Sequence, residues 1–545
     1  IILWKISGVN LAITYDSKMT WLQITLVVTT VLNLQVLQTK ASVGDVVDYV
    51  WEARETGNDN DPEHKQAYWR EDLGVNAHHW NWHTVYAVNA DPAKHKLDRK
   101  GELFYYMHRQ LVNRYDVERM SLGMPRVVPM DKWDEKIPEG LAPHLVHGKT
   151  GVAYSPRTTN TVLTDLPGLI TMAEMRTYRS RVDEAISSGK FKYEDGTEGP
   201  LDIRLLGNTV EANFDCPNRP YYAGDWGLHN NGHDLLGMVH DPKDMYNSRA
   251  NIGVMGDVKT ACRDPGFYRW HKFVDDEFEK YEQTRTPFTD KELSFPGMKV
   301  KRVRLLDSAG KKTKSLKTMM TKKVVDIEYW PDFNRRDDTK VKFTYPALDH
   351  EKFSYQIKVK NFKKTAVKAT VRIFIAPKKN SANKVLTMDE YRTLYFEMDT
   401  FVQEIKPGVS TFKRKSSESL VTIPYDQMVN SIKPVPEADE TKRAYCGCGW
   451  PENLLLPRGN AQGMEFSLVV MLTNYEDDKS DSSGGDPLPT CAKSVRYCGL
   501  LNNKWPEKHD MGYPFNRRAS AKNIEEFVKN KSNIETKYFK IFHKA

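Results

Sequence analysis

The stretch that decides the fold reads Tyr68-Trp69-Arg70-Glu71-Asp72-Leu73-Gly74-Val75-Asn76-Ala77-His78-His79-Trp80-Asn81-Trp82-His83. On a helix, His79 and His83 stand four positions apart, so both rings project from one face. One such pair is weak evidence for a metal site, because most pairs of this kind are packed or solvated histidines. A catalytic zinc protease would carry His-Glu-x-x-His, and Trp80 follows His79 instead. The pair therefore indicates a metal site only if histidines elsewhere in the chain complete the set of ligands.

Two further segments continue the pattern. A helix predicted from Gly101 onward carries His108 beside an apolar stripe of Leu103, Met107, Leu111 and Tyr115. Farther along, Leu228-His229-Asn230-Asn231-Gly232-His233 supplies a second pair of histidines four positions apart. The arrangement of a pair and a single histidine thus begins to repeat.

The sixth histidine is His271, in the segment Arg263-Asp264-Pro265-Gly266-Phe267-Tyr268-Arg269-Trp270-His271. A helix is expected to begin here, because Asp264 can act as its N-cap and Pro265 suits the first helical position.

Two pairs and two single histidines would place six imidazoles inside a four-helix bundle, where facing helices build metal sites. Imidazole suits copper, zinc, iron and nickel, and the absence of paired carboxylates near these motifs argues against a di-iron site. Two all-histidine triads also leave coordination positions for dioxygen. The pattern indicates a dinuclear oxygen-binding metal centre.

These strings resemble the two copper-site signatures of arthropod phenoloxidases and hemocyanins. The match is closer to phenoloxidase at residues 69–76, 104–108, 253–257 and 267–271. The resemblance implies two copper ions in a dinuclear type 3 site, with O2 as a substrate. In that assignment the first copper takes His79, His83 and His108, and the second takes His229, His233 and His271. His78 and His240 are then neighbours and not ligands.

The second half of the chain changes to a period of two. Residues 353–359, 367–375 and 464–472 alternate apolar side chains, which predicts strands with one face on a core and one in water. Repeated short strands favour an antiparallel, immunoglobulin-like β-sandwich. The expected fold class is therefore multidomain α + β: a helical dicopper domain over residues 42–290 and a β-sandwich over residues 291–545.

The beginning of the chain is interpreted as a leader. An apolar run from Met19 ends near Thr39-Lys40-Ala41, which predicts a signal peptide over residues 19–41 and a secreted protein. The run is too short and polar for a membrane span, so we expect none in the mature form. A buried helix of the fold is the alternative. Residues 1–18 precede the first Met and are interpreted as an untranslated-region artefact.

Length, composition and net charge limit the classes of protein to which the chain can belong. The chain has 545 residues and a formal net charge of +8, with 80 basic and 72 acidic residues interspersed along most of its length. Mixed charges of this kind describe a solvated surface, so we expect no nucleic-acid partner. A length of this order allows several domains with ample buried interior.

Cysteine usage points to an oxidising compartment. Cys446 and Cys448 are followed by Cys491 and Cys498 at offsets of 45 and 50 residues, which suggests two disulfides closing nested loops. A structural zinc is the alternative, although Cys-x-Cys is tighter than the usual zinc spacing. The string Cys446-Gly447-Cys448-Gly449-Trp450-Pro451 resembles a phenoloxidase segment that has been likened to a thioester site with Gln after Pro. Because Glu452 stands there, the resemblance favours plain disulfides, Cys446 with Cys491 and Cys448 with Cys498.

By the same resemblance, the expected function is oxidation of o-diphenols to o-quinones, and hydroxylation of monophenols is a further activity that the resemblance implies. Small phenols, catechols and dioxygen are the expected partners, in melanisation, cuticle hardening or defence. Family members keep an acidic residue just before Arg-Asp-Pro, whereas Ala261 and Cys262 occupy that stretch here. Asn81 replaces a common family histidine that is not counted as a ligand. A catalytic general base is therefore left unassigned.

Family members also begin with a helical domain that covers the copper domain. Only about twenty residues separate Ala41 from the first motif, so we expect that domain to be absent and oxidation to need no proteolysis. The oligomeric state is expected to be a monomer or a homodimer. The rivals are a hemocyanin-like oxygen carrier and a non-catalytic storage or structural relative; copper content and catechol turnover discriminate among them.

Overall fold

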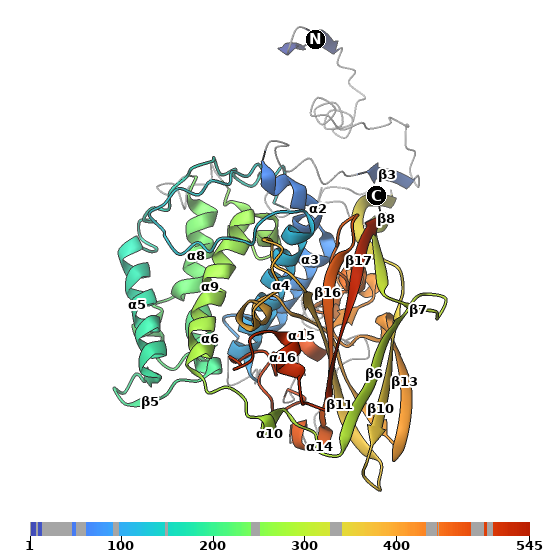
Figure 1. The fold of residues 1–545 in the computed structure, drawn as a ribbon. Coiled ribbons are helices and arrows are strands. Elements are labelled where there is room, and N and C mark those ends of the chain that lie inside the picture. Colours follow the sequence, from blue (N-terminus) through green and yellow to red (C-terminus); the bar gives the residue numbers. More distant parts are fainter. Residues whose placement is uncertain are drawn as a thin grey trace. The chain divides into compact units, whose positions relative to one another are not determined.

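A computed structural model describes residues 2–6, 9–13, 46–50, 61–90, 98–147, 151–240, 251–327, 340–431, 444, 446–480, 495–498 and 505–544 (Figure 1). Two compact units are found, one of Glu52–Lys323 with Tyr345–Ala545 and a smaller one of Ile1–Trp51 with Val324–Thr344. The predicted signal peptide lies outside the described residues. Within the smaller unit, β1 (Ile2–Ile6) and β2 (Val9–Ile13) pair antiparallel, and β3 (Val46–Val50) pairs in parallel with residues 340–344.

Helices occupy the first half of the larger unit. The α-helices of this half are α2 (Ala67–Arg70), α3 (Leu73–Val85), α4 (Lys100–Ser121), α5 (Met172–Ser188), α6 (Ile203–Glu211), α7 (Arg219–Tyr222), α8 (Gly227–Met238), α9 (Pro265–Thr284) and α10 (Asp290–Leu293). Short 3-10 helices are η2 (Pro62–Gln66), η3 (Val254–Gly256) and η4 (Ala261–Arg263). The predicted start of α9 is confirmed: Asp264 is the N-cap and accepts a hydrogen bond of 2.7 Å from the Gly266 amide.

The helical half also contains extended chain that the periodicity did not predict. Between α4 and α5 the chain makes isolated β-bridges, Ile137 with Thr161, Leu141 with Arg157 and Val146 with Ala153. After α5, β4 (Lys190–Lys192) and β5 (Glu198–Pro200) form a small hairpin.

The second half forms a two-sheet sandwich. One sheet has the strand order β13-β10-β6-β7, and in the other β12, β11, β16, β17 and β8 follow one another. Their bounds are β6 (Met298–Leu306), β7 (Lys312–Thr313), β8 (Ser315–Ile327), β9 (Lys340–His350), β10 (Ser354–Asn361), β11 (Val367–Pro377), β12 (Phe396–Ile405), β13 (Gly408–Lys415), β16 (Met464–Asn474) and β17 (Ile534–Lys544). All of these pairings with a described register are antiparallel except β17 with β8, which is parallel.

Short elements decorate the sandwich. They are α11 (Met388–Arg392), α12 (Tyr425–Ser431), α14 (Tyr475–Asp478), α15 (Val495–Cys498) and α16 (Ile524–Val528), the 3-10 helices η5 (Ser416–Glu418) and η6 (Glu452–Leu454), and the strands β14 (Thr422–Ile423) and β15 (Trp450–Pro451).

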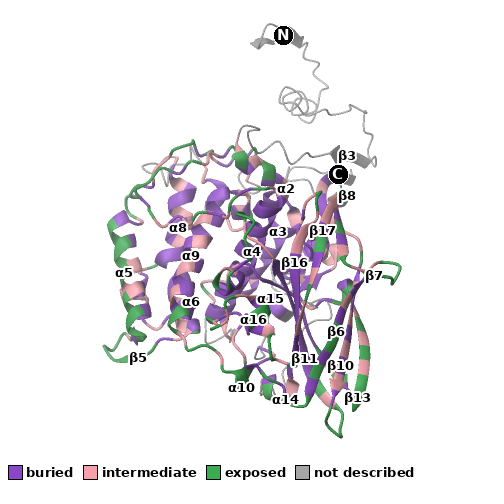
Figure 2. Ribbon diagram, viewed as in Figure 1, coloured by how far each residue is buried: buried purple, intermediate pink, exposed green. Residues whose placement is uncertain are grey.

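The prediction that each strand has one face on the core and one in water is correct for β10 and wrong for β11 and β16. Every second residue of β10 is buried, whereas β11 and β16 are buried on both faces over most of their length. The second face of this sheet lies against the helical half: Asn113 of α4 donates a 2.9 Å hydrogen bond to the Tyr395 carbonyl beside β12. Figure 2 shows the central strands and the inner helices as one buried region.

The contact between α4 and α6 is unusually close. A Cβ at Gly101 would lie 2.2 Å from the Arg204 carbonyl oxygen, and one at Gly207 would lie 2.0 Å from the Gly101 carbonyl oxygen. Only glycine at both positions allows the two backbones to approach so closely. This crossing fixes α4, the helix that carries His108.

The expected fold class is confirmed, with a helical half followed by an immunoglobulin-like sandwich. Both halves belong to one compact unit, because the first hydrophobic core includes Trp450 and Tyr497 from the second half. Among the described residues, no helix is long and apolar enough to cross a membrane.

Candidate metal centre

Four helices bring the six predicted histidines together. His79 and His83 come from α3, His108 from α4, His229 and His233 from α8, and His271 from α9. His79, His108, His229 and His271 are buried, whereas His83 and His233 are partly exposed.

The second predicted triad forms a tight group. The Nε2 atom of His233 lies 3.2 Å from Nε2 of His229 and 3.2 Å from Nε2 of His271, and the remaining pair is 3.4 Å apart. Three nitrogens that converge in this way can share one metal ion.

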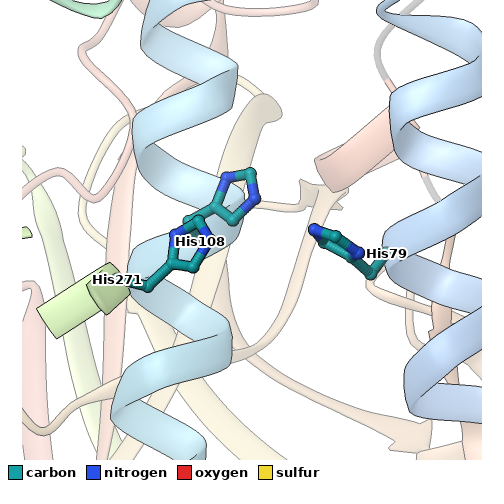
Figure 3. A group of neighbouring side chains, drawn as sticks. All are labelled: His79, His108 and His271. Carbon is teal, nitrogen blue, oxygen red and sulfur yellow. The ribbon is translucent and has the colours of Figure 1, made fainter. Parts of the chain in front are cut away.

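The first predicted triad is less symmetric. His83 Nε2 lies 3.3 Å from His108 Nε2. A second group of three that could hold a metal joins His79 and His108 with His271 (Figure 3). The rings of His108 and His271 stack at 4.4 Å. His271 therefore reaches both groups, whereas the sequence assigned it to one copper; the division of the six ligands stays a prediction.

Hydrogen bonds from Nδ1 orient four of the rings. His79 donates to the Val258 carbonyl at 3.0 Å, His108 to the Phe104 carbonyl at 2.7 Å and His233 to the Met255 carbonyl at 2.9 Å. His229 donates to Oδ1 of Asn230 at 2.8 Å. Because a carbonyl oxygen can only accept, the hydrogen resides on Nδ1 and the lone pair of the neutral ring is on Nε2.

Burial keeps the imidazoles neutral. It lowers the pKa of His108 to about 3 and the pKa of His233 to about 4. Burial also lowers the pKa values of His79, His83, His229 and His271, and the neighbouring histidines add to this effect. A neutral imidazole is the form that binds a metal ion.

The set of ligand atoms fits copper. Both groups of three contain only histidine, and their ligand atoms lie within 4.8 Å of one another. The buried Nε2 of His79 has no hydrogen-bond partner among the described residues. Such an orphaned nitrogen inside a set of imidazoles is explained by a metal ligand role, and imidazole is a good ligand for copper.

Aromatic rings enclose the histidines. Phe267 lies 5.0 Å from His79 and 4.1 Å from His271, measured between ring centroids. Phe104 lies 4.6 Å from His108 and 4.8 Å from His229. These rings shield part of the cluster from water and limit the rotation of the imidazoles.

Gly232 sets the distance between α8 and α9. A Cβ at this position would lie 1.9 Å from Cε2 of Trp270, so only glycine admits the indole. The indole Nε1 in turn donates a 3.1 Å hydrogen bond to the His229 carbonyl. This contact keeps His229 and His271 within reach of each other.

A cleft of about 560 Å³ opens onto the cluster. Four of the six histidines line it, namely His79, His83, His229 and His233. The rest of its described lining comprises Ala87, Val88, Asn89, Trp226, Asn230, Asp234, Ile252, Met255, Gly256, Asp257 and Val258. The metal centre is therefore accessible to a molecule larger than dioxygen.

The neighbours that the sequence set aside as non-ligands have other contacts. His78 donates from Nδ1 to the Cys448 carbonyl at 2.7 Å, and neither His78 nor His240 belongs to the two groups of three. Asn81 donates to the Ser431 hydroxyl at 2.9 Å. Cys262 is buried and its carbonyl accepts from the Tyr268 hydroxyl, and burial raises the pKa of its thiol, as expected of a packed residue.

Disulfides join the segments beside α3. The structure contains a bond between Cys448 and Cys498, the pairing that the resemblance implies. Cys446 is also disulfide-bonded, and its expected partner Cys491 lies outside the described residues.

The sequence predicts the six histidines as ligands but does not indicate the groups that orient their rings. Val258 and Met255 act through their main-chain carbonyls, which have no side-chain signature. The string Gly253-Val254-Met255-Gly256-Asp257 belongs to the family resemblance, but its letters do not indicate that this segment supports His233 and His79.

Comparison with known proteins identifies the same family as the sequence motifs. The family model of the hemocyanin copper containing domain matches residues 25–278, and that of the hemocyanin ig-like domain matches residues 287–543. Hemocyanin F chain of Aphonopelma sp. is 40% identical over 486 residues, which cover 88% of this chain and 75% of that protein. Phenoloxidase subunit 2 of Galleria mellonella is 39% identical over 488 residues, which cover 87% of this chain and 69% of that protein.

Two solved structures are similar as well. An activated-state scorpion hemocyanin superimposes with a TM-score of 0.82 at 38% identity, over 92% of this chain and 78% of that chain. A hemolymph type prophenoloxidase from a crustacean gives 0.80 at 31% identity, over 95% of this chain and 75% of that chain. The resemblance inferred from the motifs is confirmed: the chain belongs to the hemocyanin family, which includes hemocyanins and phenoloxidases, and carries its copper containing and ig-like domains.

Proposed function

We propose that this protein is a secreted phenoloxidase that holds two copper ions among its six histidines and oxidises o-diphenols to o-quinones with O2. The balanced reaction converts two catechols and one O2 into two quinones and two waters. Hydroxylation of monophenols, and a role in melanisation or cuticle hardening, belong to the same proposal. The Cys448–Cys498 disulfide supports secretion, because such bonds persist in oxidising compartments.

The observation that carries the proposal is the cleft. An oxygen carrier needs access only for O2, whereas a volume of about 560 Å³ lined by His79, His83, His229 and His233 can admit a phenol. Bound copper would supply the electron transfer between catechol and O2. The chain itself fixes the imidazoles through their Nδ1 hydrogen bonds, shields part of the cluster from water with Phe104 and Phe267, and leaves one side of the cluster open to the substrate.

The rival is an oxygen carrier, since hemocyanins and phenoloxidases match this chain with similar identity, 40% and 39%. Both would bind two coppers. Copper content separates these two functions from a non-catalytic storage or structural relative, and catechol turnover separates the enzyme from the carrier.

The test is oxidation of 4-methylcatechol by purified, copper-loaded protein without protease treatment. We expect quinone formation coupled to O2 consumption, and its loss in the double variant His79→Ala, His233→Ala. His144→Asn is the matched control, because His144 is exposed, lies outside the cluster and has a positive φ of 50° that Asn tolerates. Two bound coppers with reversible O2 uptake and no quinone would refute the oxidase and favour the carrier.

A further inference from the structure

The four-stranded sheet has a basic outer face. Its strands β13, β10 and β6 lie side by side in that order (Figure 1). Buried apolar residues of β10 alternate with polar residues that are partly exposed, so the polar set points away from the core. Two cations on each strand define what we call the basic face: Arg302 and Arg304 of β6, Lys358 and Lys360 of β10, and Lys413 and Lys415 of β13.

The strand register places these cations close together. Lys358 stands directly opposite Arg302, and Lys360 stands opposite Lys299, a further exposed cation of β6. Side chains at paired positions share one face of the sheet. Neighbouring strands are about 5 Å apart, and successive outward positions on one strand are about 7 Å apart. The basic face is therefore a grid of positive charge that extends over three strands.

Acidic side chains do not neutralise the basic face. The strands β6, β10 and β13 contain no Asp or Glu, and none of the six cations forms an ion pair with a residue that the structure describes. Arg414 of β13 points to the other side of the strand, where its Nε lies 2.7 Å from Oδ2 of Asp399. Asp307, in the turn after β6, accepts hydrogen bonds from two amides of its own turn. The charge of the basic face thus remains available to a partner.

This arrangement of charge reduces the stability of the sheet. Like charges directly opposite on neighbouring strands are destabilising, and Lys358 with Arg302 and Lys360 with Lys299 are two such pairs. Lysine on an edge strand can prevent pairing with another chain, but β10 and β6 each have a neighbouring strand on both sides. Protection of the sheet edge therefore explains the lysines of β13 and does not explain those of β10.

We propose that the basic face binds a linear sulfated polysaccharide, a partner that lies outside the proposed oxidase chemistry. A partner whose negative charges repeat along a chain can contact several cations of the grid at once. The guanidinium groups of Arg302 and Arg304 can each hold a sulfate through two N–H donors, because Arg presents a planar fork. Sulfate esters stay ionised at physiological pH, so the attraction does not depend on a titrating group.

Two observations favour a polysaccharide over other polyanions. The outward positions of β6, β10 and β13 carry no aromatic ring on which the bases of a single-stranded nucleic acid could stack. The Cys448–Cys498 disulfide indicates an oxidising compartment, whereas anionic lipids are concentrated in the cytoplasmic leaflet of membranes. Outside the cell, acidic polysaccharides are the polyanions that such a protein meets.

The test titrates a fluorescent heparin oligosaccharide with the purified chain, with and without copper. The triple variant Arg302→Gln, Lys358→Gln, Lys413→Gln removes one cation from each strand. At about 0.1 M NaCl we expect it to bind roughly thirtyfold more weakly than the wild type, about threefold for each exposed contact. The slope of the logarithm of affinity against the logarithm of salt concentration should become less steep by about 2. Unchanged affinity and slope in the triple variant would overturn the inference.

The stability of the triple variant is measured alongside its binding. Because Lys358→Gln and Arg302→Gln remove a like-charge pair, its free energy of unfolding should equal or exceed that of the wild type. Loss of heparin binding at undiminished stability then assigns the loss to the basic face.

A matched control removes three exposed charges elsewhere. Lys132, Lys190 and Lys529 are exposed and lie outside the four-stranded sheet. Lys132→Gln, Lys190→Gln and Lys529→Gln combined should change heparin affinity by less than about twofold. A loss equal to that of the triple variant would show that the net charge, and not the basic face, binds heparin, and would overturn the inference.

Other probes test the class of partner. Hyaluronate, which has carboxylates and no sulfates, should bind more weakly than heparin because its charge density is lower. Phosphatidylcholine vesicles that contain phosphatidylserine, and double-stranded DNA, should also bind more weakly than heparin. Tighter binding of the vesicles or of DNA than of heparin, lost in the triple variant, would overturn the polysaccharide as the partner and assign the basic face to that other polyanion.

Discussion

A single methyl group at position 232 would meet the indole of Trp270 at 1.9 Å. Gly232→Ala is therefore expected to separate α8 from α9 and to lower the free energy of unfolding by about 1–3 kcal/mol, as overpacking does. Copper binding should weaken as well, because His229 and His271 lie on the separated helices. Chemical denaturation and copper content of the purified variant measure the two effects.

A rescue variant identifies the cause. Trp270→Phe removes the part of the ring that the new Cβ would strike, at the expense of the hydrogen bond to the His229 carbonyl. Gly232→Ala combined with Trp270→Phe should be less destabilised than the sum of the single variants. Strict additivity would mean that the close approach of α8 and α9 is not what requires glycine.

Glu211 makes stability depend on pH. It is fully buried at the end of α6, its Oε1 has no hydrogen-bond partner among the described residues, and burial raises its pKa to about 7 from an ordinary value of 4.5. Unfolding between these two pH values releases a proton. The contribution of Glu211 is therefore fully present below pH 4.5 and is lost as the pH rises through 7, by at most roughly 3 kcal/mol.

Glu211→Gln removes this titration. Relative to the wild type, the free energy of unfolding of the variant should rise between pH 5 and pH 8. The difference between the two proteins cancels the titration of the histidines, because both proteins share it. Denaturation curves at several pH values measure it. Glu184→Gln, at an exposed position on α5, is the control, and its free energy of unfolding should differ from that of the wild type by an amount that does not depend on pH. A pH-independent difference for Glu211→Gln as well would show that Glu211 is not a buried, protonated carboxyl.

The residues of the metal centre illustrate what a sequence can specify. A helix repeats every 3.6 residues, so the helical period alone assigns His79 with His83, and His229 with His233, to shared faces. That His271 would reach both groups could not be predicted, because it depends on how far α9 lies from α4. The contact of Gly232 with Trp270 sets one of these distances, and nothing in the local pattern at either residue indicates it.

At the scale of elements, the start of α9 depends on one ion pair. Asp264 caps the helix and also pairs through both carboxylate oxygens with buried Arg157, with 2.7 Å from Nη2 to Oδ1. Asp264→Ala removes the cap and leaves the guanidinium unpaired, which should lower the free energy of unfolding by about 3–5 kcal/mol. Thermal denaturation would record it.

Removing the unpaired charge of Arg157 separates the contribution of the helix cap from that of the ion pair. Adding Arg157→Met to Asp264→Ala should restore part of the loss, because the remaining cost is then the missing cap and the lost packing. A double variant that is as unstable as the sum of the single ones would show that the pair itself contributes little.

The strands show where the sequence pattern failed. Alternation along 367–375 correctly predicted β11 but not the burial of its second face, where Arg372 pairs with Glu507 and Asp478. Charged residues at alternate positions normally indicate solvent. Here their partners come from distant segments of the chain, so a local pattern cannot reveal that this face is buried.

At the scale of the whole molecule, one disulfide of the sandwich half holds together two segments that contact α3, which carries His79 and His83. Cys448 accepts from His78 through its carbonyl, and Tyr497, next to Cys498, accepts from Nε1 of Trp82 at 3.1 Å. The bond closes a loop of 50 residues and should contribute about 4 kcal/mol by loop entropy. Cys448→Ala with Cys498→Ala should lose about that much in denaturant unfolding.

Since both ends of this bond contact α3, the double variant should also lose copper faster to a chelator. Free Cys216 provides the control: Cys216→Ala deletes a buried thiol that forms no disulfide and whose Sγ lies 3.5 Å from Oγ1 of Thr209 on α6. Copper loss at the wild-type rate in the double variant would show that the disulfide stabilises the fold without supporting the metal centre.

The carbonyls of Val258 and Met255 hold two of the rings, and every amino acid has a carbonyl. Replacing either side chain leaves that acceptor in place. Alanine scanning would therefore not detect that these two residues support the histidine rings. Inserting or deleting one residue between 253 and 258 would move both acceptors at once. A change of side chain at 255 or 258 therefore leaves its acceptor in place, whereas a change in the length of this segment is expected to displace both acceptors.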